Sequence, residues 1–332
     1  MGKHNKPRAG SKAYSPRVRA KKETPSIRNY ASGKDAVPLG FLCYKAGMTH
    51  FIARDMNKNN PTHNMDLQVP VTVLDCPPLM VFGIRAYVKG YKSFDVFAEV
   101  LSEKLDKDLA RVISLPKESK NAEGIKKIEQ NIDKIFEIVL LIHTQPRKTG
   151  FKKKTPEIIE LPVGGDVKAQ WAYAKSMLGK EINIKDVFAE SDVLDVMAVT
   201  KGKGFQGPVK RWGIKIQKRK HMRSGHMRHV GSVGPWSPSV LRWITPQAGR
   251  MGYHRRTEVN KIIMKIGDKG DEINPTGAFV NYGLLSGPYM LVKGSVPGSK
   301  KRAVALRKSI RVQKKPTGLA IEQISIASKQ GT

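Results

Sequence analysis

Residues 201–256 of this 332-residue chain hold the side chains whose types and spacing could do chemistry. Three glycines there have the GxGxxG spacing of a dinucleotide-binding loop: Gly202, Gly204 and Gly207. Pro208 follows the third glycine, no helix-forming segment is expected after it, and no acidic residue that could bind a ribose occurs before Glu258. We therefore expect these glycines to let the backbone approach a phosphate chain closely, with lysines alongside.

Four of the eight histidines lie in the same segment: His221, His226, His229 and His254. A metal site at His226 and His229 would need a carboxylate or thiolate partner, and the segment has no acid and no cysteine. Acid–base catalysis and metal-assisted hydrolysis also need carboxylates or a paired dyad where a polyanion binds. We therefore predict no catalytic residue, no metal and no cofactor, and expect the histidines to donate hydrogen bonds beside phosphate.

Three of the four tryptophans, Trp212, Trp236 and Trp243, also occur here. Trp212 and Trp243 adjoin aliphatic residues, so a core position and an RNA-facing position are both open for them. Trp236 lies in GSVGPWSPS, where glycines and prolines stiffen a turn and no apolar run could bury an indole. We predict that Trp236 is exposed and stacks on a base, a contact that contributes about 1–3 kcal/mol per base.

Three segments carry the whole charge excess of the chain. It has 60 Lys and Arg against 28 Asp and Glu, a net charge of +32. Residues 1–34 carry ten basic residues and one acid, residues 201–256 carry fourteen and none, and residues 293–315 carry nine and none, so the other 219 residues are neutral. Such segments repel themselves and have little apolar content, so we expect them to order only on a polyanion.

Nucleic acid is the polyanion that we expect, because Lys and Arg displace counterions from phosphates. An anionic membrane fits less well, since basic segments that bind membranes are amphipathic helices, whereas these are rich in Gly and Pro. The residues that we expect to contact RNA are Lys3, Lys6, Arg8, Lys12, Arg17, Arg19, Lys201, Lys203, Gly204, Gln206, Lys210, Arg211, Trp212, Lys218, Arg219, Lys220, His221, Arg223, His226, Arg228, His229, Trp236, Arg242, Arg250, His254, Arg255, Arg256, Lys300, Lys301, Arg302 and Arg307.

The elements that must position these residues are mainly strands. Short β-branched and aromatic runs bounded by turn residues predict a discontinuous β body, a small barrel or sandwich, over residues 37–95, 183–200 and 258–300. Helical spacing of apolar residues predicts helices over 99–113 and 124–139, and a third helix is expected over 167–179. Residues 96–182 are thus predicted to be an α/β insert, 1–36 an extended basic N-terminal arm, 201–257 a basic central finger and 301–332 a basic C-terminal tail.

Cysteine usage and hydropathy exclude several classes of protein. Cys43 and Cys76 each lie in an apolar run and are expected to be buried thiols in a reducing compartment, so no disulfide framework is predicted. The sequence has no uncharged apolar run of about 18 residues and no apolar segment near its start, so we expect neither a membrane span nor secretion. The expected location is intracellular.

Three motifs resemble those of a known family. VTKGKGFQGPVKRWG, the GPWSP turn with the later AGRMGYHRRTEVN, and YKAGMTHFIARD are similar to the universal family of the third protein of the ribosomal large subunit. The similarity runs along nearly the whole chain, and the N-terminal arm and the insert are most similar to the archaeal branch. The resemblance implies a β-barrel of the type found in translation proteins, docked on the subunit surface, with extensions running through large-subunit ribosomal RNA.

The resemblance also implies a function. It indicates a structural, non-catalytic, cytoplasmic component of the large subunit that binds ribosomal RNA beside neighbouring ribosomal proteins, supports assembly, and extends its finger toward the peptidyl transferase centre. The tip tryptophan, Trp236 here, would lie near the path of aminoacyl-tRNA, with only indirect tRNA contact, and no small-molecule substrate or membrane partner is expected. From the residues alone, an RNA-modifying or RNA-processing enzyme with basic arms and a DNA-compacting protein remain alternatives.

Overall fold

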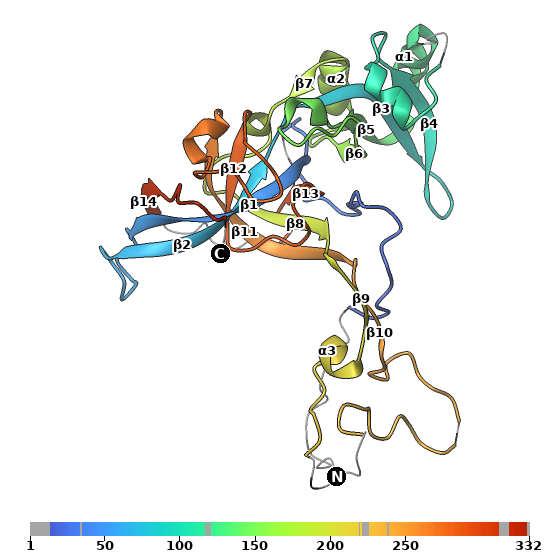
Figure 1. Ribbon diagram of the computed structural model, residues 1–332. Coiled ribbons are helices and arrows are strands. Elements are labelled where there is room, and N and C mark those ends of the chain that lie inside the picture. The colour runs from blue at the N-terminus through green and yellow to red at the C-terminus, as the bar shows by residue number, and fades with distance from the viewer. Residues whose placement is uncertain are drawn as a thin grey trace. The chain divides into compact units, whose positions relative to one another are not determined.

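The computed structural model describes residues 14–33, 35–116, 121–218, 220, 226–237, 239–311 and 319–330. The chain divides into two compact units, which are described one at a time. We call Met1–Lys22 with Val199–Arg256 the finger unit, and Glu23–Ala198 with Thr257–Thr332 the body unit. Figure 1 labels their elements, and strands predominate, so the predicted mainly β class is confirmed.

A seven-stranded antiparallel sheet forms one part of the described body. Its order is β13-β8-β11-β12-β2-β1-β14, and β13 also pairs with β1, so six strands close into a ring of pairings that β14 extends. The strands are β1 (Gly40–Asp55), β2 (Asp66–Asp75), β8 (Val193–Val199), β11 (Arg255–Gly267), β12 (Tyr289–Lys293), β13 (Ala303–Lys308) and β14 (Leu319–Ile324).

The core of this sheet follows from its apolar strands. In β1 the run Phe41 to Tyr44 is entirely buried, as are Leu74 of β2 and Tyr289 of β12. Cys43 and Cys76 are buried free thiols, as the sequence predicts. Near-complete burial of this set supplies the hydrophobic free energy that holds the sheet closed.

Strand β13 departs from the sequence prediction, which assigns residues 301–332 to a basic tail. Ala303, Val304, Ala305 and Leu306 are at most 2% exposed and pair with β1 on one side and β8 on the other. Basic residues flank the AVAL run on both sides, so the segment resembles a basic tail in the sequence. A strand that is buried in the middle of a closed sheet can consist of consecutive apolar residues, without polar alternation.

A second, five-stranded sheet has the order β4-β3-β5-β6, with β7 pairing to β3. Its strands are β3 (Leu79–Lys89), β4 (Phe94–Leu101), β5 (Ile135–His143), β6 (Ile158–Pro162) and β7 (Glu181–Ile182). Two helices pack on it, α1 (Asn121–Gln130) through Ile128 and α2 (Val167–Met177) through Trp171 and Ala174. Strands β3 and β4 belong to this sheet although both start before residue 96, where the sequence predicts the insert to begin. The boundary differs because an apolar strand pattern does not indicate which sheet a strand joins.

Two of the three predicted helices differ from the structure. Residues 99–113 hold the end of β4 and a 3-10 helix, Lys107–Arg111, so the long helix predicted there is wrong. The segment 124–139 is α-helical only to Gln130, a 3-10 turn follows at Ile132–Lys134, and β5 starts at Ile135. The third prediction is confirmed, since α2 begins after Asp166 and is followed by Gly179 at φ +77°, a left-handed conformation that suits glycine.

Short 3-10 helices complete the body at Ile132–Lys134, Pro146–Lys148, Ile184–Asp186 and Gly270–Ile273. One buried polar contact joins distant parts of the chain. The Tyr282 hydroxyl donates to Asp75 Oδ2 at 2.5 Å, and both residues are nearly inaccessible to solvent. Burial raises the pKa of the Asp75 carboxyl to about 6 and raises that of the Tyr282 hydroxyl too.

The finger unit has less regular structure. Strands β9 (Gly202–Gln206) and β10 (Gly249–Gly252) pair antiparallel, and helix α3 (Pro208–Trp212) follows Gly207. The sequence predicts no helix at this point, so that expectation is wrong. Even so, β9 pairs with an antiparallel strand rather than lying in a parallel βαβ unit, which still argues against a dinucleotide fold.

Candidate nucleic-acid interface

The N-terminal arm packs on the base of the finger. The Arg17 guanidinium carbon lies 3.9 Å from the centroid of the Trp212 ring, and Arg17 Nη1 donates to the Arg211 carbonyl at 2.6 Å. Trp212 Nε1 donates to the Gln247 carbonyl at 2.9 Å, and the indole is 6% exposed. Of the two positions open for Trp212, the structure therefore shows the buried one, in which arginine and finger backbone enclose the indole and leave little of it for contact with RNA.

His254 is the second residue that joins the arm to the finger. It is buried, and its Nδ1 lies 2.6 Å from the Val18 carbonyl, an atom that can only accept, so Nδ1 carries the proton. Burial lowers the pKa of His254, and the charges of Arg256, Arg17 and Arg211 lower it further. His254 Nδ1 is thus occupied within the protein and cannot donate to a phosphate.

Further arginine–aromatic contacts extend this packing. Arg256 lies over the Tyr14 ring at 4.3 Å and Arg19 over the Tyr253 ring at 5.7 Å. The Ala20 amide donates to the Tyr253 carbonyl at 2.8 Å, which fixes the arm beside the finger backbone. The base of the finger is therefore ordered by stacking of arginine on aromatic rings, which needs no aliphatic core.

All Asp, Glu, Lys and Arg positions of the finger unit are basic. Its two segments contain 22 Lys and Arg and no Asp or Glu. Arg211 donates through Nε to the Arg250 carbonyl at 3.1 Å and through Nη1 to the Gln247 carbonyl at 3.0 Å, so carbonyls rather than carboxylates satisfy it. Burial lowers the pKa of Arg211 and of Arg256, and the charge of Arg17 lowers both further. The unit consequently holds packed cations whose mutual repulsion an external anion would relieve.

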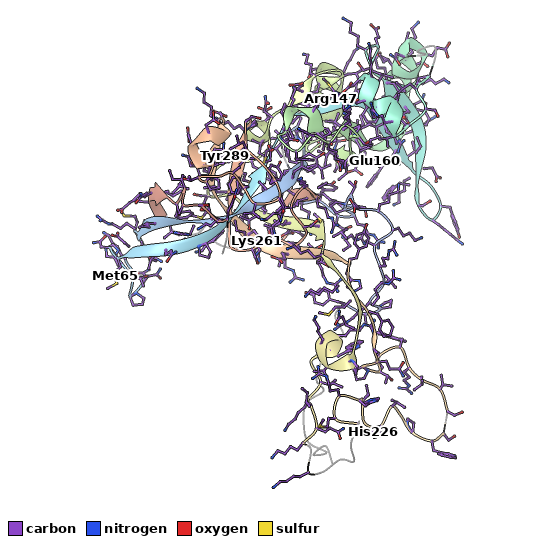
Figure 2. The ribbon with its side chains drawn as sticks, viewed as in Figure 1. Met65, Arg147, Glu160, His226, Lys261 and Tyr289 are labelled. Atoms are coloured by element: carbon purple, nitrogen blue, oxygen red, sulfur yellow. The ribbon has the colours of Figure 1, made fainter. Side chains whose placement is uncertain are left out.

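Most of the expected RNA contacts are exposed on this unit. Trp236 is 96% exposed, as the sequence predicts, and Trp243 and Phe205 are 65% and 77% exposed. His226, labelled in Figure 2, lies edge to face with His229, and their ring centroids are 5.3 Å apart. Gln206 is half-buried and donates to the Lys203 carbonyl at 2.6 Å. The other exposed members of the expected set are Arg19, Lys201, Lys203, Gly204, Lys210, Lys218, Lys220, His226, Arg228, His229, Arg242, Arg250 and Arg255.

Seven of the residues that we expect to contact RNA lie outside the described residues: Lys3, Lys6, Arg8, Lys12, Arg219, His221 and Arg223. Phe205 and Tyr14 were missed by the sequence analysis, although Phe205 lies between glycines in GKGFQG, where no apolar neighbour could bury it. That isolation is the signal that could have found Phe205. No equivalent signal marks Tyr14, since its partner Arg256 is distant in the sequence.

The C-terminal cations mainly serve the body. Arg307 Nη2 lies 3.0 Å from Asp195 Oδ2, and the two side chains are 12% and 2% exposed, respectively. Lys300 Nζ donates to the Val280 carbonyl at 2.6 Å, and Arg302 pairs with Glu23 at 3.5 Å. Only Lys301 of this expected group is exposed. The other three are half-buried and each binds an acceptor of the body, so their contact with RNA stays a prediction.

The described residues contain no group of three or more His, Cys, Asp or Glu side chains placed to hold a metal ion. Over the same residues, no helix is long and apolar enough to cross a membrane. The fold and the finger together define a class: a mainly β protein whose folded body carries an acid-free cationic extension.

Comparison with known proteins identifies the class more closely. The family described as ribosomal protein L3 matches residues 1–331. The large ribosomal subunit protein uL3 of Methanobrevibacter smithii is 50% identical over 335 residues and covers all of both chains. The uL3 proteins of Methanosphaera stadtmanae and Methanococcus aeolicus are 49% and 47% identical, over 100% and 99% of each chain.

The chain belongs to the ribosomal protein L3 family. It is therefore a structural component of the large ribosomal subunit in the cytoplasm and not an enzyme. The sequence predictions of the family, the non-catalytic role and the location are confirmed, and the alternatives of an RNA-processing enzyme and a DNA-compacting protein are dismissed.

Proposed function

We propose that the finger unit binds large-subunit ribosomal RNA and extends toward the peptidyl transferase centre. One observation carries this proposal: the two segments of the finger unit hold 22 cations and no acid, and among the described residues the half-buried Arg17 and Arg211 donate to carbonyls and lie over the Trp212 ring. Phosphate is the anion that would relieve this repulsion along an extended chain, and each contact would release counterions. The exposed lysines and arginines would bind phosphates, while Gly204, at φ +68° with no neighbouring atom to obstruct a Cβ, leaves room for RNA backbone.

Exposed aromatic rings supply the second part of the interface. Trp236, Trp243 and Phe205 present their faces on a cationic surface, an arrangement that suits stacking on unpaired bases. Trp236 is the most exposed of the three and lies in the stiff GPW turn. We assign it to the tip of the finger, where it buttresses the RNA at the catalytic centre and affects tRNA only indirectly.

The body has a supporting role in this proposal. The closed ring of six strands would be a translation-protein-type barrel docked on the subunit surface, with the five-stranded sheet and its helices as the insert. The body unit has 38 Lys and Arg against 28 Asp and Glu, a much lower density of positive charge than the finger unit, which favours contacts with neighbouring proteins and fewer contacts with RNA. The finger, the N-terminal arm and the C-terminal segment would then be ordered fully during subunit assembly.

Salt dependence of RNA binding tests the phosphate contacts. Replacing Lys210 or Arg250 by Gln in the full chain should lower the slope of log affinity against log salt by about one for each phosphate that the variant no longer neutralises. Lys104→Gln, an exposed change in the body, is the matched control and should leave the slope unchanged. Equal slopes for all three variants, or preference for duplex DNA over ribosomal RNA in direct competition, would contradict the proposal.

A second experiment addresses the tip. Trp236→Ala should weaken binding to ribosomal RNA by no more than one stacking contribution, about 1–3 kcal/mol, while it alters peptide transfer by assembled subunits. Trp243→Ala is the control for removal of an exposed indole elsewhere in the finger. If both variants transfer peptide at the wild-type rate, Trp236 has no role at the centre.

A further inference from the structure

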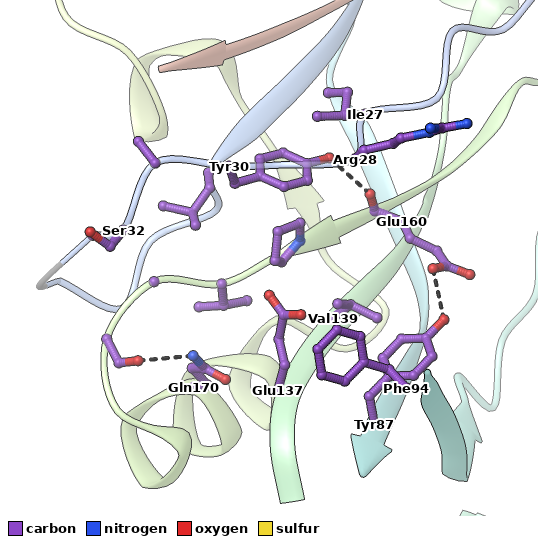
Figure 3. A pocket seen from close by; sticks show the side chains of 17 residues that line it. Ile27, Arg28, Tyr30, Ser32, Tyr87, Phe94, Glu137, Val139, Glu160 and Gln170 are labelled. Carbon is purple, nitrogen blue, oxygen red and sulfur yellow. Dashed lines mark hydrogen bonds between the residues drawn. The ribbon is translucent and has the colours of Figure 1, made fainter. Parts of the chain in front are cut away.

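A cavity of about 440 Å³ lies in the body unit between residues 27–33 and the five-stranded sheet (Figure 3). Its sheet wall comprises Tyr87 of β3, Phe94 of β4, Glu137 and Val139 of β5, and Glu160 of β6. Figure 3 shows the Glu137 side chain reaching from β5 into the cavity, toward the segment that carries Tyr30. This cavity has no part in the RNA interface proposed above.

The two carboxylates of the cavity differ in how they are satisfied. Glu160 accepts from the Tyr87 hydroxyl at 2.9 Å and also pairs with Arg85. Glu137 has no hydrogen bond or ion pair among the contacts of the described residues, and burial raises its pKa. Figure 3 shows Arg28, the cation that also lines the cavity, directed away from Glu137. A half-buried carboxylate thus faces the cavity with its acceptor positions open.

The rim of the cavity is aromatic. The rings of Phe94 and Phe136 stack with centroids 4.7 Å apart and an interplanar angle of 18°, yet each ring is about half exposed. Tyr91, in the turn between β3 and β4, and Phe97 of β4 are also exposed. We call these four aromatic residues the aromatic patch. Exposed apolar side chains that gather beside a cavity mark a surface that another molecule covers.

The chemistry of the cavity specifies one kind of occupant. Phosphate would meet the Glu137 carboxylate and an apolar rim, so RNA is disfavoured here. A guanidinium can form two parallel hydrogen bonds with a carboxylate and can stack on an aromatic ring, and both groups are present in Glu137 and Phe94. It would also offset the cost of holding that carboxylate in a half-buried site. An ammonium lacks the planar face that Phe94 would stack on.

We propose that this cavity receives an arginine side chain of a neighbouring large-subunit protein, whose chain covers the aromatic patch. The proposal rests on the place of the chain in the large subunit and specifies the surface and the residue type that a protein neighbour would use there. The arginine pairs with Glu137 and stacks on Phe94, while the patch buries apolar side chains of the same segment.

Photo-crosslinking in assembled subunits tests the partner class. Full-length chain with p-benzoyl-phenylalanine in place of Phe94 is incorporated into large subunits and irradiated, and the crosslinked products are identified. A crosslink to a protein peptide that contains arginine is expected. A crosslink to ribosomal RNA, to a peptide without arginine, or to nothing overturns the inference. The same probe in place of Phe205 reports on the finger separately, because its failure to crosslink to RNA would contradict the proposed function instead.

A charge-removing variant tests the arginine itself. Glu137→Gln keeps the size of the side chain and should lower the yield of the Phe94 crosslink about tenfold, as expected when a charged hydrogen bond is removed. Glu103→Gln, an exposed carboxylate that does not line the cavity, is the matched control. Circular dichroism of each purified variant confirms folding before assembly. An unchanged yield for Glu137→Gln would overturn the assignment of arginine.

Discussion

Replacement of Arg307 by Met should destabilise the body rather than weaken RNA binding. Arg307 lies on β13 directly opposite Asp195 on β8, and its Nε and Nη2 donate to Asp195 Oδ2 at 3.2 and 3.0 Å. The other oxygen, Asp195 Oδ1, accepts from the Asn260 amide at 3.1 Å. Asp195 is 2% exposed at its side chain, so it cannot be rehydrated when the guanidinium is removed.

The magnitude follows from this burial. Breaking a buried ion pair by removing one partner costs about 3–5 kcal/mol, because an uncompensated charge remains. The double variant Arg307→Met with Asp195→Asn should recover most of that stability, since it removes the charge and keeps an oxygen to accept from the Asn260 amide. Arg307→Lys should fall between wild type and Arg307→Met, because an ammonium keeps the charge and lacks the fork of two donors.

Urea denaturation followed by circular dichroism measures these differences, and salt-dependent binding to ribosomal RNA is measured on the same proteins. We expect the unfolding midpoint of Arg307→Met to fall and its RNA binding under native conditions to stay near that of wild type. A variant with an unchanged midpoint and weakened RNA binding would refute the reasoning and restore Arg307 to the RNA interface.

Three further predictions concern other buried contacts. Arg17→Ala removes the stack on Trp212 and one hydrogen bond, which should loosen the arm by about 1–2 kcal/mol and speed amide hydrogen exchange at Ala20. Asp75→Asn should stabilise the body by up to about 3 kcal/mol at pH 7: a carboxyl pKa raised to about 6 makes ionisation costly, and the gain should vanish in urea titrations below pH 4. The lowered pKa of His254 means that arm docking is fully stable above the unfolded histidine pKa of about 6.5 and weakens as pH falls below it, which the fluorescence of finger tryptophans would detect, and His254→Gln should remove this dependence.

Local patterns in the sequence predict local features well. The turn chemistry around Trp236 predicts its exposure, and the residues after Gly164 and Gly165 predict helix α2, because both depend on residues adjacent in the chain. The apolar spacing in 99–113 fails, since Val100 is buried as part of a strand and Leu109 as part of a 3-10 turn. Period alone could not separate those two structures.

Contacts between distant segments are the part that the sequence could not predict. β13 becomes a core strand by pairing with β1, more than 250 residues earlier, and no local signal in KKRAVALRK reveals that partner. His254 and Arg307 look like RNA contacts for the same reason, since a count of charges reports where cations are dense and not which acceptor each one reaches.

Arginine explains how a unit with no acidic residue can still fold at its base. A lysine ammonium is strongly hydrated and could not be buried beside Trp212 or Tyr14 at comparable cost, whereas a guanidinium stacks on an indole or phenol face and keeps donors for carbonyls. Burial lowers the pKa of Arg211 and of Arg256, and the nearby charge of Arg17 lowers both further, so Arg17 repels each of them. The expectation that the arms order only on a polyanion therefore does not hold for the base of the finger, which stacking of arginine on aromatic rings organises. The remaining repulsion between cations means that the unit gains stability from any phosphate that it binds.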